Sequence, residues 1–399
     1  PFRRPPGLKG ADAQERYLKA IGKLQRYDVA SSVEEGIQSL EELARREPES
    51  AIVQAALGGA YLHRYELTRD RAWAEQASVA CERARSLDSE LPEVHLTLGQ
   101  LLALTGKPLD AAAEFERALA QRPNSVEALL GLAAAHKSAG NMSKAEATYR
   151  RAIALQPNYW AVYNHLGAFY FGRGQYSQAI EMFQKVVRLE PDSVRGYNNL
   201  GAAYHRSGEF AQAREAYRKS IRLKPSDGAY SNLGTTEYFL GNYRDAATAF
   251  DQAVKLTPGK FLYWANLADA YRWTPELRSR ALGAYDRAVR LAEQALSLNP
   301  RDASAHATLA VCFAKTGNLA TARVHVERAL EIEPDDPQHL YDAATVAVLD
   351  GKPQEAITLI RSAIARGLAA KVVESEPEFK SLRDQPEFQN ALAAKRVKS

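Results

Sequence analysis

Apolar residues recur along almost the whole chain in pairs of amphipathic segments, and a glycine joins the two segments of most pairs. The clearest pair runs from Val194 to Pro225, where two apolar stripes at helical spacing flank Gly208. Apolar residues repeating every 3.6 positions predict amphipathic helices, and a proline disfavours continuation of a helix. The stretch is therefore predicted to form a helix, a tight turn and a second helix that Pro225 ends.

Three kinds of residue repeat in register with this pair. Prolines close the pairs at positions 123, 157, 191, 225, 258, 300 and 334, with spacings of 34, 34, 34, 33, 42 and 34 residues. The turn glycines, which are expected to adopt a left-handed conformation at the helix ends, are Gly106, Gly140, Gly174, Gly208, Gly241, Gly317 and Gly351. The small residues that let two helices approach are Ala111, Ala145, Ala179, Ala213, Ala246, Ala322 and Ala356. The aromatic residues that fill the gap four places later are Phe115, Tyr149, Phe183, Tyr217 and Phe250.

This pattern resembles the tetratricopeptide repeat (TPR), and the resemblance covers nearly the whole chain. The unit 194–226 carries the matching residues Tyr197, Leu200, Gly201, Tyr204, Ala213, Tyr217 and Pro225. The unit before it carries Tyr163, Leu166, Gly167, Tyr170, Ala179, Phe183 and Pro191. The resemblance implies an all-α fold, a right-handed superhelical α-solenoid of about ten helix-turn-helix units with a C-terminal capping segment.

The repeat register also predicts how the chain is divided. We expect a linker at 1–11, an array at 12–368, a helical cap at 369–394 and a frayed tail at 395–399. The predicted units are 12–50, 51–91, 92–125, 126–159, 160–193, 194–226, 227–260, 261–302, 303–336 and 337–368. Two units are seven and eight residues longer than the rest, which lengthens helices or, after Trp273-Thr274-Pro275, forms a bent loop. The Pro/Arg-rich start at Pro1 leads us to expect that the protein continues upstream.

Composition narrows the class of partner. The net charge is +4 over 399 residues, and basic and acidic residues alternate without blocks, so nucleic acid is not implied. No apolar run approaches 18 residues, so membrane insertion is not predicted. Cys81 and Cys312 fall on apolar stripes of different repeats and are predicted to be buried, reduced thiols. That leaves the compartment open, with the cytoplasm slightly favoured.

Catalytic patterns are not found in the sequence. The eight histidines lie without metal-ligand spacing, and Gly172-Arg173-Gly174 lacks the third glycine and the preceding strand of a dinucleotide loop. No phosphate-binding loop, nucleophile elbow or Cys–His pairing is present. We therefore predict no catalytic residue, no metal, no cofactor and no enzymatic activity for this chain.

A binding face is the site that the repeats do predict. In TPR proteins the first helix of each unit lines the concave face. Residues just before the repeated leucine point to that side, and an amide there can pair with the N–H and C=O of a peptide. This set is Asn199, Asn232 and Asn266, with His165 one unit earlier and Asn164 and Asn198 one place before. It resembles the asparagine ladder of O-linked N-acetylglucosamine transferase. The alternative is that these amides bond neighbouring helices.

Basic and aromatic residues surround this predicted ladder. The further candidates for the groove are Arg195, His205, Tyr238, Asp269 and Arg272. Basic groups beside aromatic side chains suit an extended peptide with acidic or aromatic side chains. The lysine/asparagine clamp of chaperone-binding TPR proteins is not found in register.

Three functions are consistent with these patterns. The first is a non-catalytic protein–protein interaction scaffold that binds an extended peptide or protein segment. The second is a substrate-recruiting or sensory region of a larger signalling enzyme, because the array resembles TPR regions that follow the kinase domain in bacterial Ser/Thr protein kinases. The third is self-association into a homo-oligomer through the end repeats or the convex face.

Overall fold

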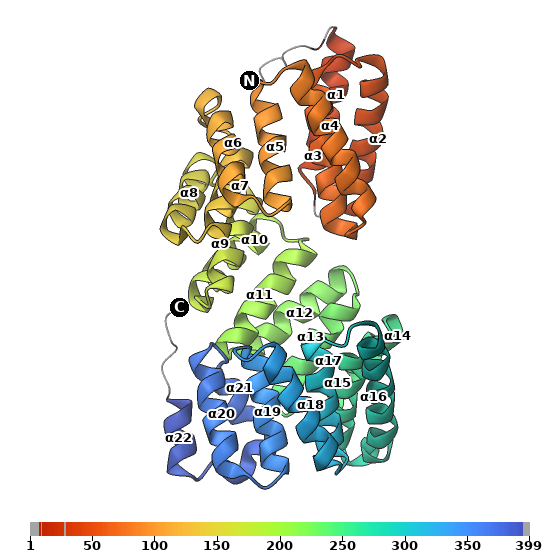
Figure 1. Cartoon of the computed structure of the whole chain (residues 1–399), viewed down its shortest axis with the longest axis vertical. Coiled ribbons are helices and arrows are strands. Elements are labelled where there is room, and N and C mark those ends of the chain that lie inside the picture. Colours follow the sequence, from red (N-terminus) through yellow and green to blue (C-terminus); the bar gives the residue numbers. More distant parts are fainter. Residues whose placement is uncertain (1–7, 9, 28, 394–399) are drawn as a thin grey trace. The chain divides into compact units, whose positions relative to one another are not determined.

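The computed structural model describes residues 8, 10–27 and 29–393. Within these residues it contains 22 α-helices, two short 3-10 helices and no strand. Helices follow one another from α1 to α22 in Figure 1. The chain divides into two compact units, Pro1–Phe169 (unit 1) and Tyr170–Ser399 (unit 2), which are described separately.

Unit 1 contains four complete pairs, and the helix after them, α9, continues past its boundary. Its helices are α1 (Ala11–Leu24), α2 (Ala30–Arg46), α3 (Ala51–Thr68), α4 (Arg71–Leu87), α5 (Pro92–Leu104), α6 (Pro108–Gln121), α7 (Val126–Ser138), α8 (Met142–Leu155) and α9 (Trp160–Gly172). The two helices of each complete pair pack against one another. Of the predicted linker, residues 1–7 and 9 lie outside the described residues, whereas Leu8 is buried in the apolar cluster of this unit.

Unit 2 contains α10 and five complete pairs. The helices are α10 (Tyr176–Leu189), α11 (Val194–Ser207), α12 (Phe210–Leu223), α13 (Asp227–Phe239), α14 (Tyr243–Leu256), α15 (Phe261–Trp273), α16 (Ala281–Leu298), α17 (Ala303–Lys315), α18 (Leu319–Ile332), α19 (Pro337–Leu349) and α20 (Pro353–Ala365). The first helices of successive pairs also contact one another, α11 with α13, α13 with α15, α15 with α17 and α17 with α19. We call the surface that α11, α13, α15, α17 and α19 share the first-helix face.

Small residues set the spacing within the pairs, as the sequence predicts. The seven repeated alanines are fully buried, and the five aromatic residues that follow them are at most 3% exposed. A Cβ atom added to Gly201 of α11 would lie 2.8 Å from a ring carbon of Tyr217 in α12, so the two helices meet where no side chain separates them. The seven turn glycines have φ between +64° and +91°, the left-handed region in which other residues are strained. The predicted all-α fold of helix-turn-helix units is confirmed for the described residues.

The two long units use their extra residues differently. In the first, α3 and α4 extend to 18 and 17 residues, and Arg69 adopts the left-handed turn conformation with φ 58°. In the second, α15 ends at Trp273, a 3-10 helix η1 (Pro275–Arg280) follows, and α16 runs for 18 residues. Both predicted outcomes, the bend and the longer helix, are therefore present in this second unit.

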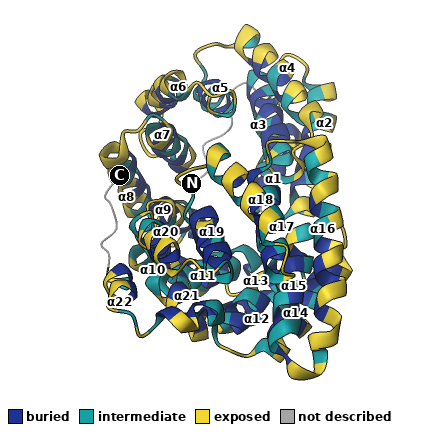
Figure 2. Ribbon diagram, turned by 60° about the horizontal axis from the view of Figure 1, so that its bottom comes forward, coloured by how far each residue is buried: buried dark blue, intermediate teal, exposed yellow. Residues whose placement is uncertain are grey.

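Three short helical turns follow α20. They are α21 (Ala370–Ser375), η2 (Pro377–Leu382) and α22 (Pro386–Leu392), and we call residues 370–392 the C-terminal segment. The segment packs η2 against α19 and α22 against α20, with Phe379 and Phe388 fully buried. It belongs to one apolar cluster with α19 and α20, and α19 is largely buried in Figure 2. The predicted tail 395–399 lies outside the described residues.

Candidate functional site

Two of the predicted groove residues of unit 2 hold carboxylates of the C-terminal segment. The hydroxyl of Tyr238, near the end of α13, donates a hydrogen bond to Glu376 Oε1 over 3.2 Å. Tyr341 of α19 donates to the other oxygen of the same carboxylate, and Arg272 of α15 forms an ion pair with Glu378. Glu376 is only 4% exposed, so this carboxylate is removed from water and is satisfied by hydroxyl groups of two helices.

We call Tyr238, Arg272 and Tyr341 the acid-binding site. These side chains come from three helices of the first-helix face, and a residue far along the chain supplies each carboxylate. Tyr238 and Tyr341 are both buried, and the Arg272 side chain is partly covered. The guanidinium offers only donors and both hydroxyls donate here, which favours acidic groups in this arrangement.

A second set of charges lies beside this site. The ammonium of Lys315, at the end of α17, contacts Asp269 Oδ1 over 2.6 Å, and Tyr285 of α16 donates to the same oxygen. Burial alone would lower the pKa of Lys315, but the carboxylates of Asp269, Glu376 and Glu378 outweigh it and raise the pKa. Lys315 therefore stays positive and helps to balance three neighbouring acids.

Burial acts on the acids in the opposite direction. It raises the pKa of Glu376, and the attraction of Lys315 and the hydrogen bond from Tyr341 only partly offset this effect. Burial also raises the pKa of Asp342, the residue after Tyr341 in α19, to about 7, although Gln338 Nε2 donates to its Oδ1 over 3.0 Å. The acid-binding site thus lies in a region where negative charge is costly and each acid depends on a specific donor.

The structure places His205 in an aromatic setting. Its ring packs beside Phe210 and Phe239, and its Nδ1 lies 3.2 Å from Thr236 Oγ1. The Thr236 hydroxyl donates its own proton to the backbone carbonyl of Asn232. The hydrogen bond between His205 and Thr236 is therefore donated by the imidazole Nδ1–H. Burial lowers the pKa of His205 to about 4, which makes the ring neutral near pH 7. The imidazole therefore offers no positive charge near pH 7.

The predicted asparagine ladder is distributed over both units. Asn164 and His165 belong to unit 1, where Asn164 is buried and His165 Nε2 lies 3.4 Å from the hydroxyl of Tyr27. The remaining members belong to unit 2: Asn198, Asn199 and Asn266 are half-buried, and so is the predicted neighbour Arg195, whereas Asn232 is exposed. Among the described residues, the side-chain Oδ1 of Asn198 is buried without a hydrogen-bond partner. The arrangement leaves Asn232 the most accessible amide of the ladder.

Unit 1 also joins residues that are far apart in the sequence. Tyr27 lies in the connection between α1 and α2, and its ring stacks on those of His63 and Trp160, with centroids 5.3 and 5.8 Å apart. With its hydroxyl beside His165, Tyr27 brings the first helix pair of the unit to its last helix. His165, a predicted ligand-binding residue, therefore already contacts the protein itself.

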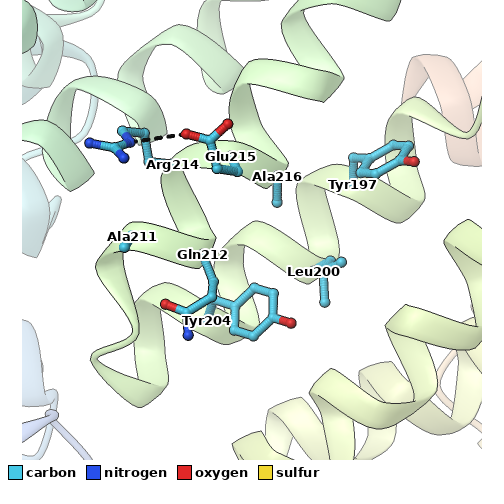
Figure 3. Close-up of a pocket in the computed structure, with 8 residues that line it drawn as sticks. All are labelled: Tyr197, Leu200, Tyr204, Ala211, Gln212, Arg214, Glu215 and Ala216. Carbon is cyan, nitrogen blue, oxygen red and sulfur yellow. Dashed lines mark hydrogen bonds and ion pairs between the residues drawn. The ribbon is translucent and has the colours of Figure 1, made fainter.

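A pocket of about 520 Å³ opens between α11 and α12 (Figure 3). Tyr197, Leu200 and Tyr204 line it from α11, and residues 211, 212 and 214–216 line it from α12. The sequence places these three residues on the apolar stripe, yet both tyrosines are only half-buried. The hydroxyl of Tyr204 accepts a hydrogen bond from Gln184 Nε2 of α10 over 2.8 Å, so one end of the pocket is polar.

Other chemistry is sparse in the part of the chain that is described. Cys81 and Cys312 are free and buried, as predicted, and burial raises the pKa of the Cys81 thiol to about 12. No three His, Cys, Asp or Glu side chains among the described residues are grouped so that they could hold a metal ion. Among the same residues, every helix is too short or too polar to cross a bilayer.

Comparison with known proteins agrees with the repeat pattern. Three family models described as tetratricopeptide repeat match residues 102–167 and 279–345, residues 161–226 and residues 231–273. The chain therefore belongs to the tetratricopeptide repeat family. Proteins built from these repeats are protein-interaction scaffolds, and this is the functional class to which the chain belongs. No curated protein matches it.

Several solved structures are similar to parts of the chain. A tetratricopeptide repeat protein from Parabacteroides merdae is 17% identical, with 68% of this chain and 98% of that chain covered and a TM-score of 0.47. PilF of Pseudomonas aeruginosa is 21% identical, with 52% and 92% covered and a TM-score of 0.44. MamA of Desulfovibrio magneticus is 23% identical, with 41% and 94% covered and a TM-score of 0.38.

The sequence pattern missed several residues of the acid-binding site. Tyr238 and Arg272 were predicted as groove residues, but Tyr341, Glu376 and Glu378 were not, because repeat spacing predicts contacts only between neighbouring units. One available signal was the C-terminal segment itself, in which Glu376-Pro377-Glu378-Phe379 combines two acids with an aromatic residue. That is the ligand chemistry that the basic and aromatic groove residues predict.

Proposed function

We propose that this protein is a non-catalytic scaffold that binds an extended peptide or protein segment along the first-helix face of unit 2. One observation supports the proposal above the others. Tyr238 and Arg272, which the repeat register predicts as ligand-binding residues, hold acidic side chains of a polypeptide segment on this face. A surface that binds one segment of chain through side chains has the chemistry to bind another.

The amides of the same face supply contacts that do not depend on ligand sequence. Asn199 on α11 and Asn232 on α13 belong to helices that contact one another. An extended chain rises about 3.3 Å per residue, and neighbouring helices lie about 8–10 Å apart, so one amide per repeat reaches about every third ligand residue. The ladder thus adds affinity, and the charged groups beside it select acidic or aromatic ligands.

The test uses peptides selected on the intact chain from a random library. The affinity of a selected peptide is then measured for wild type, for Asn199→Ala/Asn232→Ala and for the control Asn141→Ala. Asn141 precedes α8, is exposed and makes no capping hydrogen bond through its side chain. Loss of hydrogen bonds from two amides is expected to weaken binding by about tenfold in the double variant only. Equal affinity in all three proteins would remove the ladder from the binding site.

A further inference from the structure

The C-terminal segment contacts the array through buried aromatic rings and through acidic side chains, and its two copies of one pattern separate these two kinds of contact. It contains two copies of a short pattern, Glu376-Pro377-Glu378-Phe379 and Gln385-Pro386-Glu387-Phe388. In each copy the proline begins a helical turn and the phenylalanine is fully buried. A buried aromatic ring is therefore common to both copies.

The acids distinguish the first copy from the second. Glu376 and Glu378 are held by Tyr238, Tyr341 and Arg272, whereas Glu387 is exposed and Gln385 takes the place of the other acid. The helix α22 thus packs against the end of the array without burying an acid. Because burying a charged group is costly, the acid contacts of the first copy are poorly explained by stability alone. They are better explained as recognition of a particular sequence.

Local geometry fits such recognition. Glu376 precedes η2 and accepts a hydrogen bond from the N–H of Glu378 over 3.4 Å, which fixes the spacing of the two carboxylates. One carboxylate then reaches α13 and α19, the other reaches α15, and Phe379 enters the apolar cluster of α19 and α20. Three features of the segment, two acids and an aromatic ring, are therefore all bound by side chains of unit 2.

We propose that Tyr238, Arg272 and Tyr341 form a recognition site for acidic segments of the Glu-Pro-Glu-Phe type, that the chain's own C-terminal segment occupies this site, and that a partner segment of the same chemistry binds by displacing it. The proposal rests on the proposed function, because it assigns one ligand class and one competitor to the same face. A tethered segment competes at an effective concentration on the order of millimolar, so an external ligand binds the wild-type chain weakly until the internal contacts are loosened.

The experiment uses the full chain and a fluorescent synthetic peptide with the sequence of residues 373–382. Its affinity is measured by anisotropy for wild type, for Glu376→Gln/Glu378→Gln and for the control Glu387→Gln. The first variant weakens the internal competitor while keeping its size, so it is expected to bind the peptide at least about tenfold more tightly than wild type. The control, which alters the exposed acid of the second copy, is expected to bind as wild type does.

Two further measurements make the result specific. Adding Arg272→Met to the double variant is expected to abolish the gain, and a peptide with glutamine at both acidic positions is expected not to bind. Hydrogen exchange in residues 370–382 of the wild-type chain is expected to rise at saturating peptide. Circular dichroism establishes that each variant is folded, so failure of the folded double variant to bind the peptide would overturn the proposal.

Other outcomes also decide the question. Equal affinity for Glu376→Gln/Glu378→Gln and Glu387→Gln, or unchanged hydrogen exchange at saturating peptide, would show that the segment is a fixed cap and no competitor. The result is independent of the asparagine test. If Asn199→Ala/Asn232→Ala binds its peptide as wild type does but Glu376→Gln/Glu378→Gln gains affinity for the acidic peptide, only the amide contacts are rejected. If the asparagine variant loses affinity but the glutamine variant gains none, only the acidic ligand and its displacement are rejected.

Discussion

Arg272 of α15 forms an ion pair with Glu378, a residue 106 positions later in the chain. The Glu378 side chain is 7% exposed and that of Arg272 is 30% exposed, so the pair lies mostly out of water. Repeats of this kind normally contact only their neighbours. In unit 2 the C-terminal segment therefore joins its last repeat to α13 and α15, and the contacts across this junction can be tested one at a time.

Removing the guanidinium is expected to destabilise unit 2. Arg272→Gln leaves the Glu378 carboxylate buried without its partner, which is expected to cost about 2 to 3 kcal/mol of unfolding free energy because Arg272 keeps part of its hydration. Chemical denaturation measures this loss. The matched control is Arg244→Gln, which breaks the exposed ion pair with Glu276 and is expected to cost less than about 1 kcal/mol. Similar losses in the two variants would contradict the buried character of the first pair.

The close helix contact in the clearest repeat gives a second prediction. Gly201→Ala places a methyl group 2.8 Å from the Tyr217 ring and is expected to destabilise the protein by about 1 to 3 kcal/mol through overpacking. Gly283, on the exposed side of α16, has no neighbour within 4 Å of such a methyl group. Gly283→Ala is therefore expected to stabilise the protein by about 0.5 to 1 kcal/mol. Thermal unfolding of the two variants distinguishes steric from conformational effects, and stabilisation by both would disprove the close contact.

His205 predicts a loss of stability in mild acid. Its pKa is about 4 in the folded chain and about 6.5 in the unfolded chain, so the unfolded state binds the proton first. The stability that depends on a neutral His205 is fully present above about pH 6.5 and is lost as the pH falls toward 4. His205→Phe, which keeps the contacts with Phe210 and Phe239, is expected to reduce the loss between pH 7 and pH 4 by an amount on the order of 2 kcal/mol. Parallel pH profiles of wild type and variant would refute a buried neutral imidazole.

Asp342 predicts the opposite dependence. Burial raises its pKa to about 7, whereas an unfolded aspartate titrates near 4, so ionisation favours the unfolded state. Stability contributed by the protonated form is present below about pH 4 and is lost as the pH rises to about 7. Asp342→Asn is expected to melt at a higher temperature than wild type at pH 8 and at a similar temperature at pH 4. A higher melting temperature of the wild type at pH 8 would indicate that the carboxylate is stabilised by its neighbours.

Much of the fold could be predicted because its determinants are local and periodic. Gly208 and Ala213 each have six counterparts in other repeats and Tyr217 has four, so many occurrences of one pattern reinforce a single interpretation. The eight extra residues of the second long unit fit both a longer helix and a bend after Trp273, and the structure contains both. The unit boundaries and the asparagine ladder stay predictions.

The candidate site could be predicted only in part, for a physical reason. Position within a repeat indicates which side chains face the groove, and it selected Tyr238 and Arg272. It does not indicate which distant segment those side chains meet, because the contact of Tyr238 with Glu376 spans 138 residues and has no periodic signal. It also places His205 at the groove, but it does not indicate that burial beside Phe210 and Phe239 keeps the imidazole neutral near pH 7.

The bond between Tyr238 and Glu376 has a consequence for how unit 2 folds. A chain of repeats with contacts only between neighbours can unravel from its end one repeat at a time. Here Glu376 of the C-terminal segment accepts hydrogen bonds from both α13 and α19, so unfolding of the segment also exposes α13. Residues 170–392 are therefore expected to unfold in one cooperative transition. During synthesis on the ribosome, α13 and α15 are expected to become fully protected from solvent only after the final residues of this unit have been made.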